Sequence, residues 1–422
     1  MNTSTPSTAS PSRLLPRDRL AELLDLAQSF RGWNRKQLAD FIGRDPRNLI
    51  PNSGIPKLDL VIRLGHVLEW PIEQVVGFLQ GEDAPGTVDQ QVTAGESFDE
   101  VYDRSGVAHR EGNFQITIEL ARHALSLATT HVQHMKSLNR EAGGWDGLGR
   151  HKDAHAALHR ALKHATGRTE IELLVRSNLA NAHYSLWHLF EGRGVARDLI
   201  ASLSNNPPKS HPGRIALAMS YYSRGHSYRR LLDAHPHGCR LLAQLSSTDL
   251  RRAHSEYLHI AELTGDSSYA DIARTCLGGA MEAEVVLGQR RAEDVVGVFS
   301  DSLDEMIEPD SCTRADALEQ CGWWCIFGCN VLLRHVPPSD ERERFLAVFT
   351  NKADQIADHL GNWSLRERVV NLDFVRRIRS LAGKGEPLAL DDTDMRAITG
   401  TMGRFDRFRP LGWQILRSSR VV

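Results

Sequence analysis

A glycine-led helical segment that occurs twice constrains the fold of this chain more than any other feature. GNFQITIELARHALSLA begins at Gly112, and GRHKDAHAALHRALKHA begins at Gly149, 37 residues later. In both copies a bulky residue stands two positions after the glycine, small residues recur at helical spacing, and an Ala-Leu pair follows. Self-similarity at a period of about 20–50 residues indicates a stack of repeated structural units, here helical hairpins.

The physical requirements of such a stack agree with these positions. A glycine lets the chain reverse between two helices, and each hairpin leaves an apolar face that the next hairpin covers. Weaker copies follow in SNLANAHYSLWHLF, in the pair around Gly288, and in ADALEQCGWWCIFGCNVLLRH with RERFLAVFTNKADQIADHLG. The glycine, bulky residue and Ala-Leu pattern resembles the second helix of a tetratricopeptide repeat, which implies about six or seven such hairpins.

Composition divides the 422 residues into five parts. Residues 1–16 are rich in Ser, Thr and Pro, which is typical of a disordered tail. Residues 17–80 carry short amphipathic runs, and residues 81–96 are polar with Gly and Pro, which favours a linker. Residues 97–385 read as helix nearly throughout, whereas residues 386–422 are expected to form an irregular basic tail. The predicted fold class is all-α, with a small helical domain followed by an α-solenoid.

The N-terminal domain is predicted to consist of short helices with recognisable ends. Asn34 is suited to cap a helix that ends at Gly43. Asp45 is suited to cap the next helix, with Pro46 at its first position, where a missing N–H costs nothing. Pro51 ends that second helix.

This pattern resembles the helix-turn-helix domain of the Cro/C1-type repressors. RKQLADFIG matches the first helix with its terminal glycine, and LDLVIRLGHVLEWPIEQV matches the later helix pair. In that family the helix after the glycine lies in the major groove, so the resemblance implies a recognition helix from Asp45 to Ile50. Residues 31–63 hold seven Lys/Arg against three Asp in a chain of net charge −2, which agrees with DNA binding. The candidate contacts to bases or phosphates are Lys36, Gln37, Arg44, Arg47, Asn48, Lys57 and Arg63.

The segment departs from the family after the recognition helix. About three residues are missing before the next helix, and Pro51 ends the recognition helix early. Two functions therefore stay open. One is a DNA-binding transcriptional regulator, and the other is a non-enzymatic interaction scaffold whose helix-turn-helix unit does not bind DNA.

The helical array offers a groove for an extended peptide or a partner helix. In tetratricopeptide proteins that clamp peptides, an Asn on the first helix of a hairpin holds the peptide backbone. Asn178 precedes Leu179-Ala180 at the corresponding place, with Asn181 and Arg176 nearby. The resemblance implies peptide binding by Arg176, Asn178 and Asn181, and a solvated or capping role for the Asn is the alternative.

The combination of the two domains resembles bacterial cytosolic regulators that sense small peptides and dimerise through their helical arrays. The partners that this resemblance implies are double-stranded DNA, a peptide or protein ligand, and a second copy of the chain. No stretch approaches the roughly 18 apolar residues of a membrane span, so no membrane is expected. Six Cys in this length suit a reducing cytoplasm.

Several groups of residues resemble metal, redox or catalytic sites. His151, His155 and His159 recur every four residues over about 12 Å of helix, which is too long for one tetrahedral ion. They are interpreted as a solvated or inter-repeat face, as are His131 and His134. The remaining candidates are Cys321, Cys325 and Cys329 among aromatic residues, which predict a buried helix, and Gly278-Gly279, which predicts close helix packing. No catalytic motif occurs, so we expect no enzyme, cofactor or metal.

Overall fold

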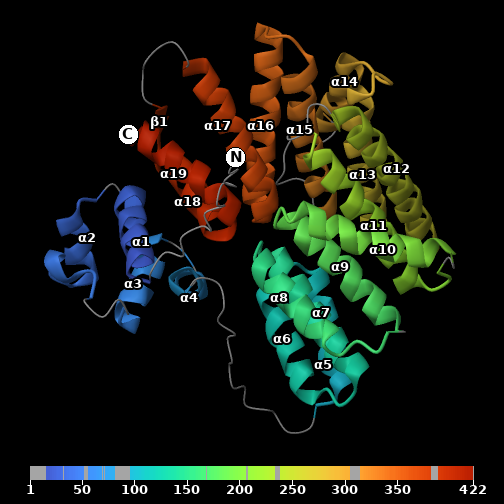
Figure 1. Cartoon of the computed structure of the whole chain (residues 1–422), viewed down its shortest axis with the longest axis horizontal. Helices are drawn as coiled ribbons and strands as arrows, with labels where there is room; N and C mark the ends of the chain where they lie inside the picture. Colours follow the sequence, from blue (N-terminus) through green and yellow to red (C-terminus); the bar gives the residue numbers. More distant parts are fainter. Residues whose placement is uncertain are drawn as a thin grey trace, which may run out of the picture. The chain divides into compact units, whose positions relative to one another are not determined.

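A computed structural model describes residues 16–31, 33–51, 56–68, 70, 72–80, 96–167, 169–205, 208–232, 238–304, 314–381 and 388–421. These residues are almost entirely helical, which confirms the predicted all-α class (Figure 1). Two short strands, β1 (Leu388–Leu390) and β2 (Ser419–Val421), pair in parallel. The chain divides into two compact units: unit 1 is Met1–Asp89 with Arg377–Val422, and unit 2 is Gln90–Arg376. The predicted tail at residues 1–16 and the predicted linker at residues 81–96 lie outside the described residues, except for residues 16 and 96.

Unit 2 is an array of helical hairpins followed by a further helix (Figure 1). From α5 to α16 each helix packs against the next, and the first helices of successive hairpins also touch one another. This arrangement confirms the predicted tetratricopeptide-like array. The hairpins are α5 (Phe98–Arg110) with α6 (Phe114–Leu127), α7 (His131–Gly147) with α8 (His151–Leu162), α9 (Glu170–Ser185) with α10 (Leu189–Asn205), α11 (His211–Arg230) with α12 (Cys239–Thr264), α13 (Ser267–Val286) with α14 (Ala292–Asp304), and α15 (Ala315–His335) with α16 (Asp340–Leu360), and α17 (Trp363–Leu381) follows.

Left-handed backbone at the hairpin turns explains why glycine marks the repeat. Gly112, Gly149 and Gly288 have φ angles of 76°, 68° and 73°, a region that costs other residues about 1–2 kcal/mol. Trp187 stands at the turn between α9 and α10 with φ 64°. Its indole ring compensates by packing 4.4 Å from the guanidinium carbon of Arg230.

Small and apolar residues fill the centre of unit 2 as the sequence predicts. A Cβ on Gly278 would meet Trp324 Nε1 at 2.5 Å, and one on Gly279 would meet His226 Cε1 at 2.7 Å. These distances confirm that the glycine pair allows close packing of α13. The cysteines of α15 are buried, as predicted for Cys321, Cys325 and Cys329. Burial raises the pKa of the Cys325 thiol, so this side chain behaves as a small hydrophobic residue.

Unit 1 begins with short helices that enclose a small core. Leu20, Leu23, Leu38, Leu60 and Leu64 are fully buried in it. Among the described residues of the whole chain, no helix has the length and apolarity that a membrane crossing requires. The helices are α1 (Pro16–Arg31), α2 (Arg35–Ile42), the 3-10 helix η1 (Pro46–Asn48), α3 (Leu58–Leu68) and α4 (Ile72–Gln80).

The C-terminal segment completes unit 1, which corrects the expectation of an irregular tail at residues 386–422. It forms α18 (Asp392–Arg404), the 3-10 helix η4 (Asp406–Phe408) and α19 (Arg409–Ser418). Helix α18 packs against α1 and α4, and a Cβ on Gly403 would meet the Trp70 ring at 2.7 Å. The Arg409 guanidinium carbon lies 4.7 Å from the centre of the Phe78 ring. The apolar residues of this segment bury against a partner some 300 residues earlier in the chain, which a local pattern does not reveal.

Candidate functional site

Helix α2 has the ends that the sequence predicts. The Asn34 side chain accepts hydrogen bonds from the backbone N–H groups of Lys36 and Gln37, both at 3.0 Å. Gln37 Oε1 accepts from the Asn34 N–H at 2.8 Å, which completes a capping box. Gly43 ends the helix with φ 69°. The Gln37 side chain, a candidate phosphate contact, therefore already stabilises the start of α2.

The segment expected to be a recognition helix from Asp45 to Ile50 is only the three-residue 3-10 helix η1. Asp45 caps it as predicted and accepts from the Arg47 N–H at 2.8 Å. The Asn48 N–H donates to Asp45 O, an i→i−3 bond typical of a 3-10 turn. Pro46 O accepts from Arg35 Nε at 3.0 Å, and Pro51 has no N–H with which to extend a helical ladder beyond η1.

Two further candidate DNA contacts, Arg44 and Arg63, are engaged inside unit 1. Arg44 Nη2 donates to both carboxylate oxygens of Asp59, at 2.8 and 3.0 Å. This hydrogen bond holds the pKa of Asp59 below its ordinary value. Arg63 Nη1 donates to Phe41 O at 3.0 Å, next to the end of α2. These contacts join the end of α2 to α3 and give both arginines a structural role.

The remaining basic candidates are exposed. Among the described residues, no hydrogen bond or ion pair engages the side chains of Lys36, Arg47 or Lys57, and Asn48 is also exposed. The Arg35 contact to Pro46 O brings the start of α2, and so Lys36, to η1. The Arg44–Asp59 ion pair joins the segment just before η1 to the first turn of α3, which begins directly after Lys57. We call Lys36, Arg47, Asn48 and Lys57 the basic face.

On the array, the structure pairs one predicted clamp residue with an asparagine that the sequence analysis missed. Asn178 Nδ2, on α9, donates to Asn139 Oδ1, on α7, at 2.9 Å. Arg176 Nη2 donates to Glu172 Oε1 at 2.7 Å, and Asn181 is half-buried one turn further on. The first helices of two successive hairpins therefore contribute one amide each. The signal that could have identified Asn139 is its separation of 39 residues from Asn178, which is close to the length of one repeat.

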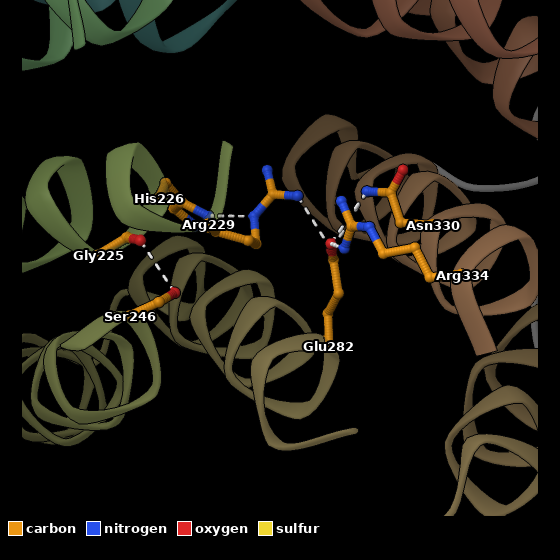
Figure 2. Close-up of polar contacts among 7 residues, drawn as sticks. All are labelled: Gly225, His226, Arg229, Ser246, Glu282, Asn330 and Arg334. Atoms are coloured by element: carbon orange, nitrogen blue, oxygen red, sulfur yellow. Dashed lines mark hydrogen bonds and ion pairs between the residues drawn. The ribbon is translucent and has the colours of Figure 1, made fainter. Parts of the chain in front are cut away.

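A carboxylate deep in unit 2 binds two guanidinium groups and one amide. Figure 2 shows Glu282, on α13, with the guanidinium groups of Arg229 and Arg334 on its two sides. Arg229 Nη1 donates to Glu282 at 2.9 Å and Arg334 Nη1 at 2.6 Å, and the Asn330 amide donates at 3.2 and 3.3 Å. These contacts join α11, α13 and α15. The sequence analysis did not identify this cluster, because charged residues on a helix usually face water.

The same cluster fixes the protonation of a buried histidine. Arg229 Nε donates to His226 Nδ1 at 3.2 Å (Figure 2), so this nitrogen carries a lone pair. Burial, followed by the charges of Arg229 and Arg230, lowers the pKa of His226 well below its ordinary value. His226 is therefore neutral, and its Nε2 carries a proton with no hydrogen-bond partner among the described residues.

Four histidines of consecutive hairpins lie close together. His155 and His159 are one turn apart on α8, with their Nε2 atoms at 3.2 Å. The His183 ring, on α9, has its centre 4.6 Å from that of His155, and the His188 ring centre lies 5.8 Å from that of His183. Burial, followed by the neighbouring imidazoles, lowers the pKa of His155 and of His183 to about 4. Both rings are therefore neutral at pH 7.

His151 differs from the solvated face expected for it. It is buried, and it forms hydrogen bonds with Asp146 Oδ1 at 2.8 Å and with Ser364 Oγ, on α17, at 2.7 Å. His155 and His159 do occupy an inter-repeat face, the other part of that expectation. His134, on α7, likewise stacks on His164, which lies just after α8, with ring centres 4.6 Å apart.

No protein-family model matches this chain, and no curated protein matches it either. Among solved structures, one similar protein is described as Rap protein complexed with competence and sporulation factor. It is 13% identical, with a TM-score of 0.45, over 95% of this chain and 99% of that one. Another is Bacillus thuringiensis PlcR in complex with the peptide PapR7 and DNA, which is 12% identical, with a TM-score of 0.34, over 84% of this chain and 99% of that one. Scores this low carry no function from either protein to this chain.

Proposed function

We propose that this chain is a cytoplasmic, DNA-binding transcriptional regulator whose helical array receives a peptide or protein signal. The observation that carries the DNA-binding part is the basic face of unit 1. Its three cations are exposed and, within the described residues, take part in no ion pair, whereas Arg44 and Arg63 of the same unit bind acceptors of the protein. Exposed cations without acidic partners are what phosphate contacts require.

Two kinds of contact would divide the work on this face. Lys36 and Lys57 would neutralise phosphates and position the unit on the duplex without reading sequence. Arg47 and Asn48 stand on η1, where a guanidinium suits guanine and a carboxamide suits adenine in the major groove. Because η1 is only three residues long, it would read fewer base pairs than a full recognition helix does. We therefore expect phosphate contacts to supply most of the affinity.

Capture of chromosomal DNA by the full-length protein tests this proposal without knowledge of the operator. We expect the protein to enrich a limited set of fragments from a sheared chromosomal library at 0.15 M salt. Sequencing of the recovered DNA is the measurement, with the same resin without protein as the control. If no fragment is enriched above that control, the alternative is favoured, a non-enzymatic interaction scaffold that does not bind DNA.

The signal-receiving part of the proposal rests on the asparagine pair of α7 and α9. The bond from Asn178 to Asn139 leaves the Asn139 NH₂ group and the Asn178 oxygen without a hydrogen bond among the described residues. A peptide backbone offers a carbonyl oxygen that could accept from this NH₂ group and an N–H that could donate to this oxygen. The pair is therefore complementary to an extended peptide. Arg176 and Asn181, on the same helix, would extend the contact.

Selection from a displayed library of random short peptides tests the clamp. The full-length protein is expected to enrich peptides that bind Asn139→Ala/Asn178→Ala at least about tenfold more weakly, because two hydrogen bonds to the backbone are lost. Fluorescence anisotropy with a labelled peptide measures the loss. Gln244→Ala, at an exposed amide on α12, is the matched control and should bind normally. Equal binding by the double variant, or a library that yields no peptide, would contradict the clamp.

A second copy of the chain remains a prediction. A homodimer would present two copies of unit 1 to the two half-sites of a palindromic operator. A ligand on the array would alter DNA binding only as far as it binds the DNA-competent state more tightly than the other.

A further inference from the structure

Three of the clustered histidines lie at the separation that a metal ion requires. One ligand nitrogen from each of His155, His159 and His183 lies within 4.8 Å of the others. In tetrahedral coordination, with Zn–N bonds of about 2.0–2.1 Å, two ligand nitrogens are roughly 3.3 Å apart. The α8 pair already has its Nε2 atoms 3.2 Å apart. A small side-chain rotation of His183 would complete the triad.

One of the three histidines also has a ring nitrogen without a partner among the described residues. His183 Nδ1 is buried and has no hydrogen-bond partner in the described part of the chain. The Nε2 atoms of His155 and His159 contact each other, which places one N–H donor and one lone pair between two rings. Burying an imidazole nitrogen without a partner is unfavourable, and a coordinated ion would remove that cost.

From this arrangement we propose that His155, His159 and His183 form a binding site for a divalent transition-metal ion, with Zn²⁺ as the best-suited ion. Imidazole suits Zn²⁺, Ni²⁺ and Cu²⁺, whereas Mg²⁺ and Ca²⁺ prefer carboxylate and carbonyl oxygens. Three protein ligands leave a fourth position for a water molecule or for exposed His188, which precedes α10. The site shares no residue with the proposed DNA and peptide contacts.

The ion would join two neighbouring hairpins of the array. His155 and His159 belong to α8, the second helix of one hairpin, and His183 belongs to α9, the first helix of the next. Coordination across this boundary would fix the packing of α9 on α8. Because the unfolded chain does not hold the three rings together, bound metal would stabilise the folded array by mass action.

Isothermal titration calorimetry of the untagged full-length protein with Zn²⁺ tests the site after removal of metal with a chelator. We expect one tight ion per chain in the wild type. His159→Ala and His183→Ala should each weaken binding at least about tenfold, since each removes one of three ligands. At a hundredfold excess of Zn²⁺ over its Kd, Tm should rise by several degrees in the wild type alone.

Two controls make the outcome decisive. His159 is exposed, so its loss should leave the far-UV circular dichroism of the metal-free protein unchanged, and misfolding cannot explain the lost binding. His164→Ala removes a member of the other histidine group, beside His131 and His134, and should keep full affinity. The proposal is overturned if the wild type binds no tight ion, if His159→Ala and His183→Ala bind normally, or if His164→Ala is the variant that loses Zn²⁺.

Discussion

Glu282→Gln is expected to lower the free energy of unfolding of the array by about 3–5 kcal/mol. The substitution keeps the size of the side chain and removes its charge. Arg229 and Arg334 would then be left without their shared counter-ion, and their side chains are only 3% and 19% exposed. A buried charge that loses its partner bears the full desolvation penalty, which is far larger than the value of one hydrogen bond.

A neighbouring carboxylate provides the matched control for this prediction. Glu284, two residues further along α13, binds Arg251 and Arg290 at 2.8 and 2.7 Å. Those arginines are 39% and 42% exposed, so water can solvate them when the partner is lost. Glu284→Gln should therefore cost only about 1 kcal/mol.

Thermal unfolding of the full-length variants measures the difference. Tm of the array should fall much further for Glu282→Gln than for Glu284→Gln. Adding Arg229→Met to Glu282→Gln should restore part of the stability, because it removes one of the uncompensated charges. Equal decreases in the two single variants would contradict the role assigned to the Glu282 cluster.

The triple variant Lys36→Ala/Arg47→Ala/Lys57→Ala is expected to bind duplex DNA about 100-fold more weakly than the wild type at 0.15 M salt. The two phosphate contacts, from Lys36 and Lys57, each contribute about 0.9 to the slope of log K against log salt. The loss of the Arg47 contact to a base removes about 1–3 kcal/mol more, and together these losses give this decrease. The three side chains are exposed and take part in no ion pair among the described residues, so the variant should fold normally. Anisotropy of a labelled duplex from the captured fragments is the measurement.

A charge-matched variant on unit 2 controls for the change in net charge. Lys163→Ala/Arg197→Ala/Lys209→Ala removes three exposed cations from the array. It should retain the affinity of the wild type, because those positions lie outside the basic face. A similar loss in both triple variants would show that overall charge, and not the basic face, determines binding.

The array could be predicted because its signals are local. Gly112 and Gly149 mark turns whose φ angles exclude most other residues, and the small residues after them fit between paired helices. The same reasoning fails at the turn before α10, where Trp187 adopts the glycine conformation and packs on Arg230. There a distant contact compensates for an unfavourable local geometry.

Parts of the candidate sites depend on contacts that no local pattern contains. Asp45 capped its helix as predicted, but the segment forms only a 3-10 turn, in which Pro46 O binds Arg35 and after which Pro51 offers no N–H. Asn178 was a candidate, whereas its partner Asn139 comes from the preceding hairpin. Pairings of this kind require the packing of one hairpin on the next.

The histidines also show what a local pattern cannot predict. The spacing along α8 excluded one ion for His151, His155 and His159, and His151 indeed turns away to Ser364. His183 joined the other two only through the packing of α9 on α8. The helical period predicts which residues share a face of one helix, but it does not predict which residues of another helix pack against that face.

The salt dependence of DNA binding is the sharpest test of whether the basic face of unit 1 binds duplex DNA. The measurement is the slope of log K against log salt for the full-length protein and for Lys36→Ala/Arg47→Ala/Lys57→Ala. We predict a steep decrease of affinity with salt in the wild type and a slope smaller by about 1.8 in the variant, because it lacks the two phosphate contacts of Lys36 and Lys57. The same slope in both proteins, or binding that does not depend on salt, would contradict the account.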